Sequence, residues 1–127
     1  MILVDSSIYI FWARRRIDPQ ERLAHWIRAQ ELASCGTIRV EVLRGMIDAE
    51  QKVFATEFFD LLQEIPTDAK LWQEIAELAW KLDRIGFVVP IPDLTIACCA
   101  LRWDLELFTL DRHFLKVPKL RVHLGEP

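Results

Sequence analysis

The sequence lacks the features that would point to a membrane, secreted or repetitive protein. No apolar run approaches the ~20 residues that a membrane span needs, and no repeat, linker or low-complexity tract divides the 127 residues. The N-terminus has no basic region of the kind that begins a signal peptide, and Asp5 interrupts its apolar run. We therefore expect a single domain, residues 1–127, that is cytoplasmic and has no membrane partner.

The sequence also has few cysteines and no excess of positive charge. Cys35, Cys98 and Cys99 have no metal-ligand spacing, and adjacent residues on a helix point to different sides, so we expect three buried thiols. Lysine and arginine together number 16 against 19 acidic residues, which gives a formal net charge of −3. The chain as a whole would therefore not attract nucleic acid, and any such binding must use a local basic patch or a metal ion.

Short apolar runs alternate with longer segments of helical periodicity. Hydrophobic residues make up 52% of the chain, enough to bury a core. Strands that are joined by helices predict an α/β fold with a central parallel sheet and helices on both faces. The pattern predicts strands at 2–4, 31–34, 105–109 and 120–124, and helices at 7–15, from 18, from 37, around 54–62, at 71–82 and at 94–101.

The segment 90–114 is the centre of this organisation. Pro90 and Pro92 are expected to prevent a helix up to that point, and Asp93 then stands where a helix N-cap belongs. The helix that follows is apolar on nearly every side, which predicts that it is buried. A short strand then ends just before Asp111. One carboxylate would thus open a helix while another closes a strand, both at one edge of the sheet.

Two further carboxylates are expected at the same edge. Asp5 directly follows the strand 2–4, and Glu41 lies one turn into the helix from 37, where Arg44 could orient it. Ligands of open α/β sheets lie outside the carboxyl ends of the strands. Clustered carboxylates repel one another, and Mg²⁺ both removes that repulsion and prefers oxygen ligands. A hydrolase could use such an ion to activate water and stabilise charge on a phosphate. Taken singly, each acidic residue could equally be a cap, a turn residue or a solvated side chain.

Four sequence blocks together resemble the PIN domain, and most closely the VapC toxins of bacterial type II toxin–antitoxin modules. The blocks are Asp5-Ser6-Ser7 after Ile2-Leu3-Val4, residues 34–45 (SCGTIRVEVLRG), residues 92–97 (PDLTIA) and residues 109–114 (TLDRHF). The resemblance implies a Mg²⁺- or Mn²⁺-dependent endoribonuclease that acts on RNA. It also implies that the protein is usually a homodimer and is inhibited by a cognate antitoxin protein that wraps around it.

The resemblance also implies roles for individual residues. By position, Asp5, Glu41, Asp93 and Asp111 match the acidic residues that serve the family as catalytic and metal-ligating groups, and Ser7 and Thr109 match the polar residues that steady them. Many relatives carry further acidic residues after the last of these, whereas here Arg112 and His113 follow Asp111.

The basic residues beside the proposed site have two interpretations. Arg112, His113 and Lys116 could contact phosphate, or they could belong to a solvated loop. His113 is a poor metal-ligand candidate because no second histidine is near it in the sequence. His25 and His123 are expected to be structural.

Other functional classes fit less well. A receiver-type signalling domain would need an acidic pair in the first turn, where Asp5 stands alone, and a haloacid-dehalogenase-type phosphatase would need an aspartate where Ser7 stands. A catalytically silent PIN-like module that binds RNA or protein is the remaining alternative.

Overall fold

The computed structural model describes residues 1–127 and contains one five-stranded sheet in the order β3-β2-β1-β4-β5. All four pairs of neighbouring strands are parallel, which confirms the predicted α/β fold. The strands are β1 (Ile2–Val4), β2 (Leu32–Cys35), β3 (Gln63–Ile65), β4 (Glu106–Thr109) and β5 (Arg121–Leu124).

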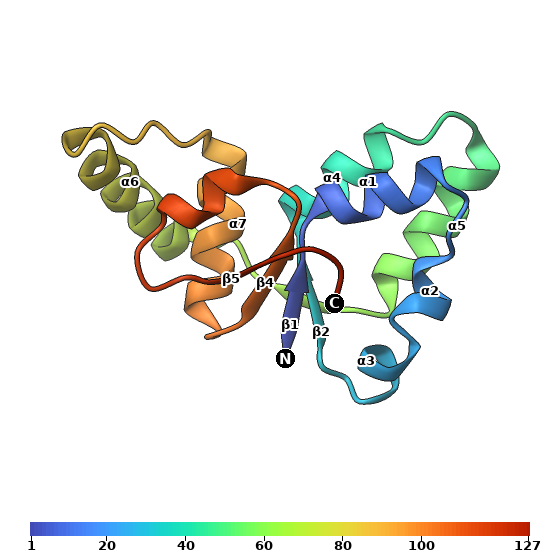
Figure 1. Ribbon diagram of the computed structural model, residues 1–127. Coiled ribbons are helices and arrows are strands. Elements are labelled where there is room, and N and C mark those ends of the chain that lie inside the picture. The colour runs from blue at the N-terminus through green and yellow to red at the C-terminus, as the bar shows by residue number, and fades with distance from the viewer.

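Helices cover both faces of the sheet, as predicted. Figure 1 shows α6 and α7 on one side of it, and α1, α2 and α5 on the other. None of the helices is both long and apolar enough to cross a bilayer. The helices are α1 (Ser6–Arg14), α2 (Pro19–Arg22), α3 (Ala24–Arg28), α4 (Gly36–Arg44), α5 (Ala49–Asp60), α6 (Ala69–Arg84), α7 (Ile91–Arg102) and the short 3₁₀ helix η1 (Arg112–Lys116).

The core is built from the central strands and α7, whose side chains are apolar on every side. All three residues of β1 are buried, and every residue of α7 from Leu94 to Ala100 is buried. Each such Leu or Ile that leaves water stabilises the fold by about 1.5–3 kcal/mol. The free cysteines Cys35, Cys98 and Cys99 are buried as expected. Because residues 94–100 are buried in the core, α7 is held in place, and Asp93 directly precedes this buried stretch.

Two local predictions differ from the structure. The helix expected from residue 18 is divided into α2 and α3 at Leu23, whose ψ of 14° interrupts the helical backbone. The strand β3 was not predicted, because the periodic Leu61 and Leu62 extend the pattern of α5 beyond its end at Asp60.

The strand order reverses between β1 and β4, and the space outside the carboxyl ends of these two strands is called the crevice below. From β1 the chain continues outward to β2 and β3, then returns to β4 on the opposite side of β1. Open α/β sheets bind their ligands at such a reversal, outside the carboxyl ends of the strands. Asp5 follows β1 there, and its backbone N–H donates to the carbonyl of Phe108 in β4 at 2.9 Å.

Candidate active site at the carboxyl edge of the sheet

Asp5 lies at the centre of the crevice and is only 4% exposed. Its Oδ2 atom accepts hydrogen bonds from Ser7 Oγ at 2.6 Å and from Thr109 Oγ1 at 2.8 Å. Both hydroxyls are themselves oriented, since Ser7 Oγ accepts from the Leu110 N–H and Thr109 Oγ1 from the Asp111 N–H. Residues at the ends of β1 and β4 thereby fix the Asp5 carboxylate. Ser7 and Thr109, the two polar residues that the resemblance pairs with the acidic residues, both donate hydrogen bonds to Asp5.

Ser6 connects Asp5 to Glu41. Its hydroxyl lies 3.4 Å from Asp5 Oδ1 and 3.3 Å from Glu41 Oε1, and its single proton can be donated to only one of them at a time. Glu41 reaches this point from α4, which begins directly after β2. Arg44, expected to orient Glu41, forms no ion pair with it. Ser6 performs that role instead.

Asp93 approaches the crevice from α7, and its predicted role as N-cap is wrong. The helix begins at Ile91 with Pro90 as its N-cap, so Asp93 lies in the first turn. Pro92 does not prevent this start because the first N–H groups of a helix have no intrahelical partner. The Asp93 side chain is 17% exposed. Because the Asp93 carboxylate does not cap the helix, it is available to the site, where the charges of Asp111 and Asp5 act on it.

Asp111 and His113 complete the site from η1. Asp111 is the N-cap of η1, and its Oδ1 accepts from the His113 N–H at 2.9 Å. The His113 Nδ1 atom lies 3.3 Å from Asp111 Oδ1 and 3.4 Å from Asp93 Oδ2. One ligand atom from each of these three residues lies within 4.8 Å of the others.

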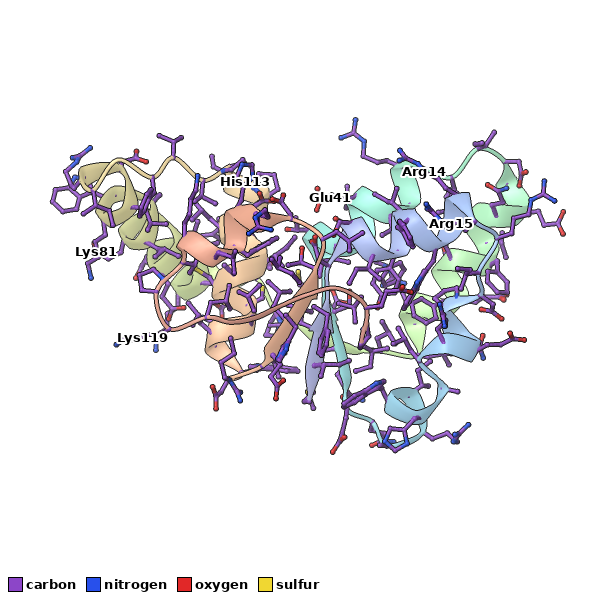
Figure 2. The ribbon with its side chains drawn as sticks, viewed as in Figure 1. Arg14, Arg15, Glu41, Lys81, His113 and Lys119 are labelled. Atoms are coloured by element: carbon purple, nitrogen blue, oxygen red, sulfur yellow. The ribbon has the colours of Figure 1, made fainter.

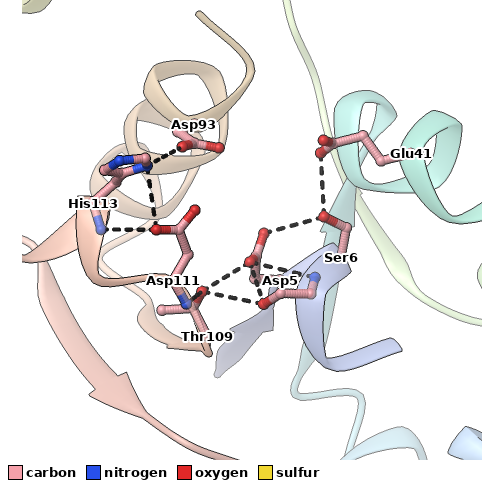
Figure 3. A network of polar contacts seen from close by, with 8 residues as sticks. Asp5, Ser6, Glu41, Asp93, Thr109, Asp111 and His113 are labelled. Atoms are coloured by element: carbon pink, nitrogen blue, oxygen red, sulfur yellow. Dashed lines mark hydrogen bonds and ion pairs between the residues drawn. The ribbon is translucent and has the colours of Figure 1, made fainter. Parts of the chain in front are cut away.

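The site thus has two facing halves. Figure 3 shows Asp93, Asp111 and His113 on one side, and Asp5, Ser6 and Glu41 on the other, joined through Thr109. In Figure 2, Glu41 and His113 lie at the same upper edge of the molecule, near the crevice. Four carboxylates that are up to 106 positions apart in the chain are therefore gathered where β1, β4, α4 and α7 meet.

Comparison with known proteins identifies the family. The model of the PIN domain family matches residues 2–120. The chain belongs to the PIN domain family. No curated protein matches its sequence.

Solved structures share this PIN fold over nearly the whole chain. VapBC2 from Rickettsia felis, bound to a DNA fragment from its promoter, is similar at a TM-score of 0.79 and 22% identity, over 97% of this chain and 98% of that one. DNA-bound VapBC from Salmonella typhimurium gives a TM-score of 0.79 and 21% identity over the same shares. FitAcB from Neisseria gonorrhoeae gives 0.66 and 18%, over 96% of each chain. At these identities the likeness establishes the fold.

Two carboxyls of the PIN domain site hold protons more tightly than usual. Burial raises the pKa of Glu41, and the negative charges of Asp5 and Asp93 raise it further against the opposing hydrogen bond from Ser6. Burial also raises the pKa of Asp93, together with the charges of Asp111 and Asp5, while His113 lowers it. The site therefore carries excess negative charge, which either a proton or a cation would relieve.

The remaining sequence candidates lie outside this network. Arg112 is exposed and forms no ion pair, and the Lys116 ammonium stands 5.7 Å from the centroid of the Phe87 ring. Sequence reasoning treated Ser6 only as part of a helix start, although a serine directly after a strand-end aspartate was the available signal. It also judged His113 by the absence of a second histidine, whereas the structure surrounds His113 with two carboxylates.

Proposed function

We propose that this PIN domain is a Mg²⁺- or Mn²⁺-dependent endoribonuclease, the toxin of a toxin–antitoxin pair. The observation that carries the proposal is the convergence of Asp5, Glu41, Asp93 and Asp111 from four separate elements on one crevice. Caps and turns alone would not require these carboxylates to face one another, since burial and, after it, their mutual repulsion raise the pKa of Glu41 and of Asp93. The PIN family implies such a nuclease.

The donor set fits a hard divalent cation. Carboxylate oxygens are the ligands that Mg²⁺ and Mn²⁺ prefer, and such ions usually keep several waters besides one or two carboxylates. Asp93 and Asp111 would hold the ion, with Asp5 and Glu41 facing it as ligands directly or through water. When bound, the cation would lower the pKa of a water molecule and neutralise charge that develops on a phosphate.

The chain's own residues have distinct tasks in this reaction. Ser7 and Thr109 hold the Asp5 carboxylate in one orientation, which prepares it before the substrate arrives. Glu41 is the group that we assign to accept the proton of the attacking water, because its raised pKa makes it a better proton acceptor than an ordinary glutamate. The Ser6 hydroxyl lies within hydrogen-bond distance of both carboxylates and so holds Glu41 in a fixed position relative to Asp5.

RNA is the proposed substrate, although the net charge of the chain is −3. Local positive charge then has to position the phosphate backbone. Arg112 and Lys116 lie on η1 beside Asp111, and Arg14 ends α1, which begins at the site. In Figure 2, Arg14 lies toward the same upper edge as Glu41. A strand of RNA along this edge would meet these side chains on either side of the carboxylates.

An antitoxin is the proposed protein partner. The solved structures named above are VapBC and FitAcB assemblies, and the present chain has a groove that suits a partner segment. It is a cavity of about 580 Å³ between α1, α4 and α5, with Tyr9, Val42, Phe54, Phe58 and Phe59 among its lining residues. Nine of the 15 lining residues are hydrophobic, so an amphipathic segment could bury its apolar face there.

We also propose a homodimer, as the family implies. Ile85 and Val88 lie between α6 and α7, and Ile91 is the first residue of α7; their side chains are 62%, 75% and 65% exposed. A second copy would cover these aliphatic side chains, which lie just before Asp93 in the chain. Light scattering should then report twice the 14.9 kDa mass of one chain.

RNA cleavage by the purified protein tests the enzymatic proposal. The wild type should cleave RNA with Mg²⁺ or Mn²⁺ and should stop when a chelator removes the ion. Asp5→Asn should lose nearly all activity while keeping its fold, because the amide is almost isosteric but carries no charge. An inactive, folded and metal-loaded wild type that still binds RNA would favour the catalytically silent binding module.

A further inference from the structure

His113 is the nitrogen donor among the carboxylates of the site. Its ring lies at the exposed rim, with the side chain 47% exposed, while its backbone is fixed by the hydrogen bond to Asp111 and by the buried Phe114 that follows. One ring atom, Nδ1, stands close to carboxylate oxygens from two different elements, Asp111 of η1 and Asp93 of α7. The Nδ1 side of the ring is therefore directed toward the two carboxylates, while the rest of the ring stays at the exposed rim.

The distance of Nδ1 from each carboxylate oxygen matches that of two ligands on one ion, and all three atoms lie within 4.8 Å of one another. Two donors that each lie ~2.1 Å from a common cation are separated by ~3.0 Å at a right angle and by ~3.4 Å at a tetrahedral angle. Nδ1 lies 3.3 Å from Asp111 Oδ1 and 3.4 Å from Asp93 Oδ2. An ion could thus bind these three atoms with small movements of the side chains.

A nitrogen donor changes which cation such a site prefers. Mg²⁺ is a hard ion that favours oxygen and gains little from imidazole, whereas affinity of nitrogen-containing sites rises along the first transition series from Mn²⁺ to Co²⁺ and beyond. We infer that His113 is a metal ligand and makes this site selective for Mn²⁺ over Mg²⁺. The inference rests on the proposed function, because Asp93 and Asp111 must hold the ion that His113 selects.

The competing role for His113 is that of a counter-charge. An imidazolium between two carboxylates would have the same distances, would occupy the place of the cation and would have to leave when an ion binds. Removal of an imidazolium would raise the affinity of the site for every divalent ion by the same factor. Removal of a ligand would instead weaken Mn²⁺ much more than Mg²⁺, and the two roles therefore predict opposite changes.

Calorimetric titration of the metal-free protein with Mn²⁺ and with Mg²⁺ separates them. In His113→Ala the ratio of the Mg²⁺ to the Mn²⁺ dissociation constant should fall by roughly tenfold or more, the scale found when a group that supports a metal site is lost. His113→Gln, which offers an oxygen in place of the nitrogen, should show the same fall. The matched control is His123→Ala, because His123 of β5 is also about half exposed but pairs with Glu106 of β4. That variant should keep the wild-type ratio.

Electron spin echo spectroscopy of bound Mn²⁺ gives a readout that is independent of affinity. Modulation from a coordinated imidazole nitrogen should be present in the wild type and in His123→Ala, and absent in His113→Ala. An unchanged ratio, or an equal rise in affinity for both ions in His113→Ala, would overturn the inference while leaving the carboxylate site intact. If neither ion bound the wild type, the proposed metal-dependent function would fail as well.

Discussion

Asp93→Asn is the substitution that most sharply separates a metal site from a set of structural carboxylates. Asp93 does not cap its helix, so the change removes charge without removing a cap. Its pKa is raised by burial and by the charges of Asp111 and Asp5. The metal-free variant should therefore be as stable as the wild type at neutral pH, or more stable, because one repulsive charge is gone.

Metal should raise the Tm of the wild type much more than that of Asp93→Asn. A ligand that binds only the folded state stabilises it by about 2.7 kcal/mol at a hundred times its dissociation constant. For a chain of 127 residues the entropy of unfolding is roughly 0.27 kcal/mol/K, so the wild-type Tm should rise by about 10 °C. A hundredfold weaker site in Asp93→Asn would leave about 0.4 kcal/mol at the same metal concentration, a rise of roughly 1.5 °C.

Thermal unfolding with increasing Mn²⁺ or Mg²⁺ measures this difference. Glu57→Gln on α5 is the control, since Glu57 is exposed and forms no ion pair, and its Tm should rise as in the wild type. Equal rises in all three proteins would refute the reasoning, because the ions would then act without Asp93.

Further predictions concern pH and the antitoxin groove. The folded-state pKa of Glu41 and of Asp93 is raised, so each group lowers the free energy of unfolding when it is charged. This destabilisation should disappear as the pH falls toward the ordinary carboxyl pKa of about 4. Urea unfolding without metal should therefore show Glu41→Gln to be more stable than the wild type at pH 7.5, with a smaller difference at pH 5; a difference that grows at pH 5 would contradict the assigned sign. In the groove, Phe54→Asp should weaken binding of the antitoxin by roughly tenfold or more, as truncated or charged anchors do, while Val53→Asp, a neighbouring exposed position, should not. Equal affinities of the two variants, measured by calorimetry, would place the antitoxin elsewhere.

The sequence was most informative where one residue's environment follows from its immediate neighbours. The run Ile2-Leu3-Val4 followed by Asp5 predicts a buried strand that ends in a carboxylate, and β1 and Asp5 have these positions. The apolar stretch after Asp93 predicts a buried helix for the same reason, because no face of it is polar enough to meet water. Gly86, which follows the end of α6, has a φ of +86°, a conformation that suits glycine.

The sequence was less informative where two elements must meet. Nothing in the neighbours of Ser6 shows that Glu41 will lie 3.3 Å from its hydroxyl, because that distance depends on how α4 packs against α1. The contacts of His113 with Asp93 likewise depend on how η1 docks on α7. The strand β3 was missed because Gln63 and Glu64 are polar and acquire a strand conformation only through pairing with β2.

The start of α7 illustrates a third cause, a local rule that admits two outcomes. Proline stops a helix in its interior but is accepted in the first turn, and Pro92 satisfies either interpretation. Where the helix begins determines the role of Asp93. As an N-cap its oxygens would accept from backbone N–H groups, whereas in the first turn they are available to the site.

Transfer of solvent oxygen to cleaved RNA tests the central claim most directly. If water activated at the carboxylate crevice attacks the phosphodiester, RNA that the Mn²⁺-loaded wild type cleaves in ¹⁸O-water should gain one ¹⁸O atom in each newly formed terminal phosphate. The reaction should be absent with a chelator and in Asp5→Asn. Products that end in a 2′,3′-cyclic phosphate without ¹⁸O would mean that the RNA's own hydroxyl is the nucleophile, and undiminished cleavage in the chelator or in Asp5→Asn would place the activity outside this site.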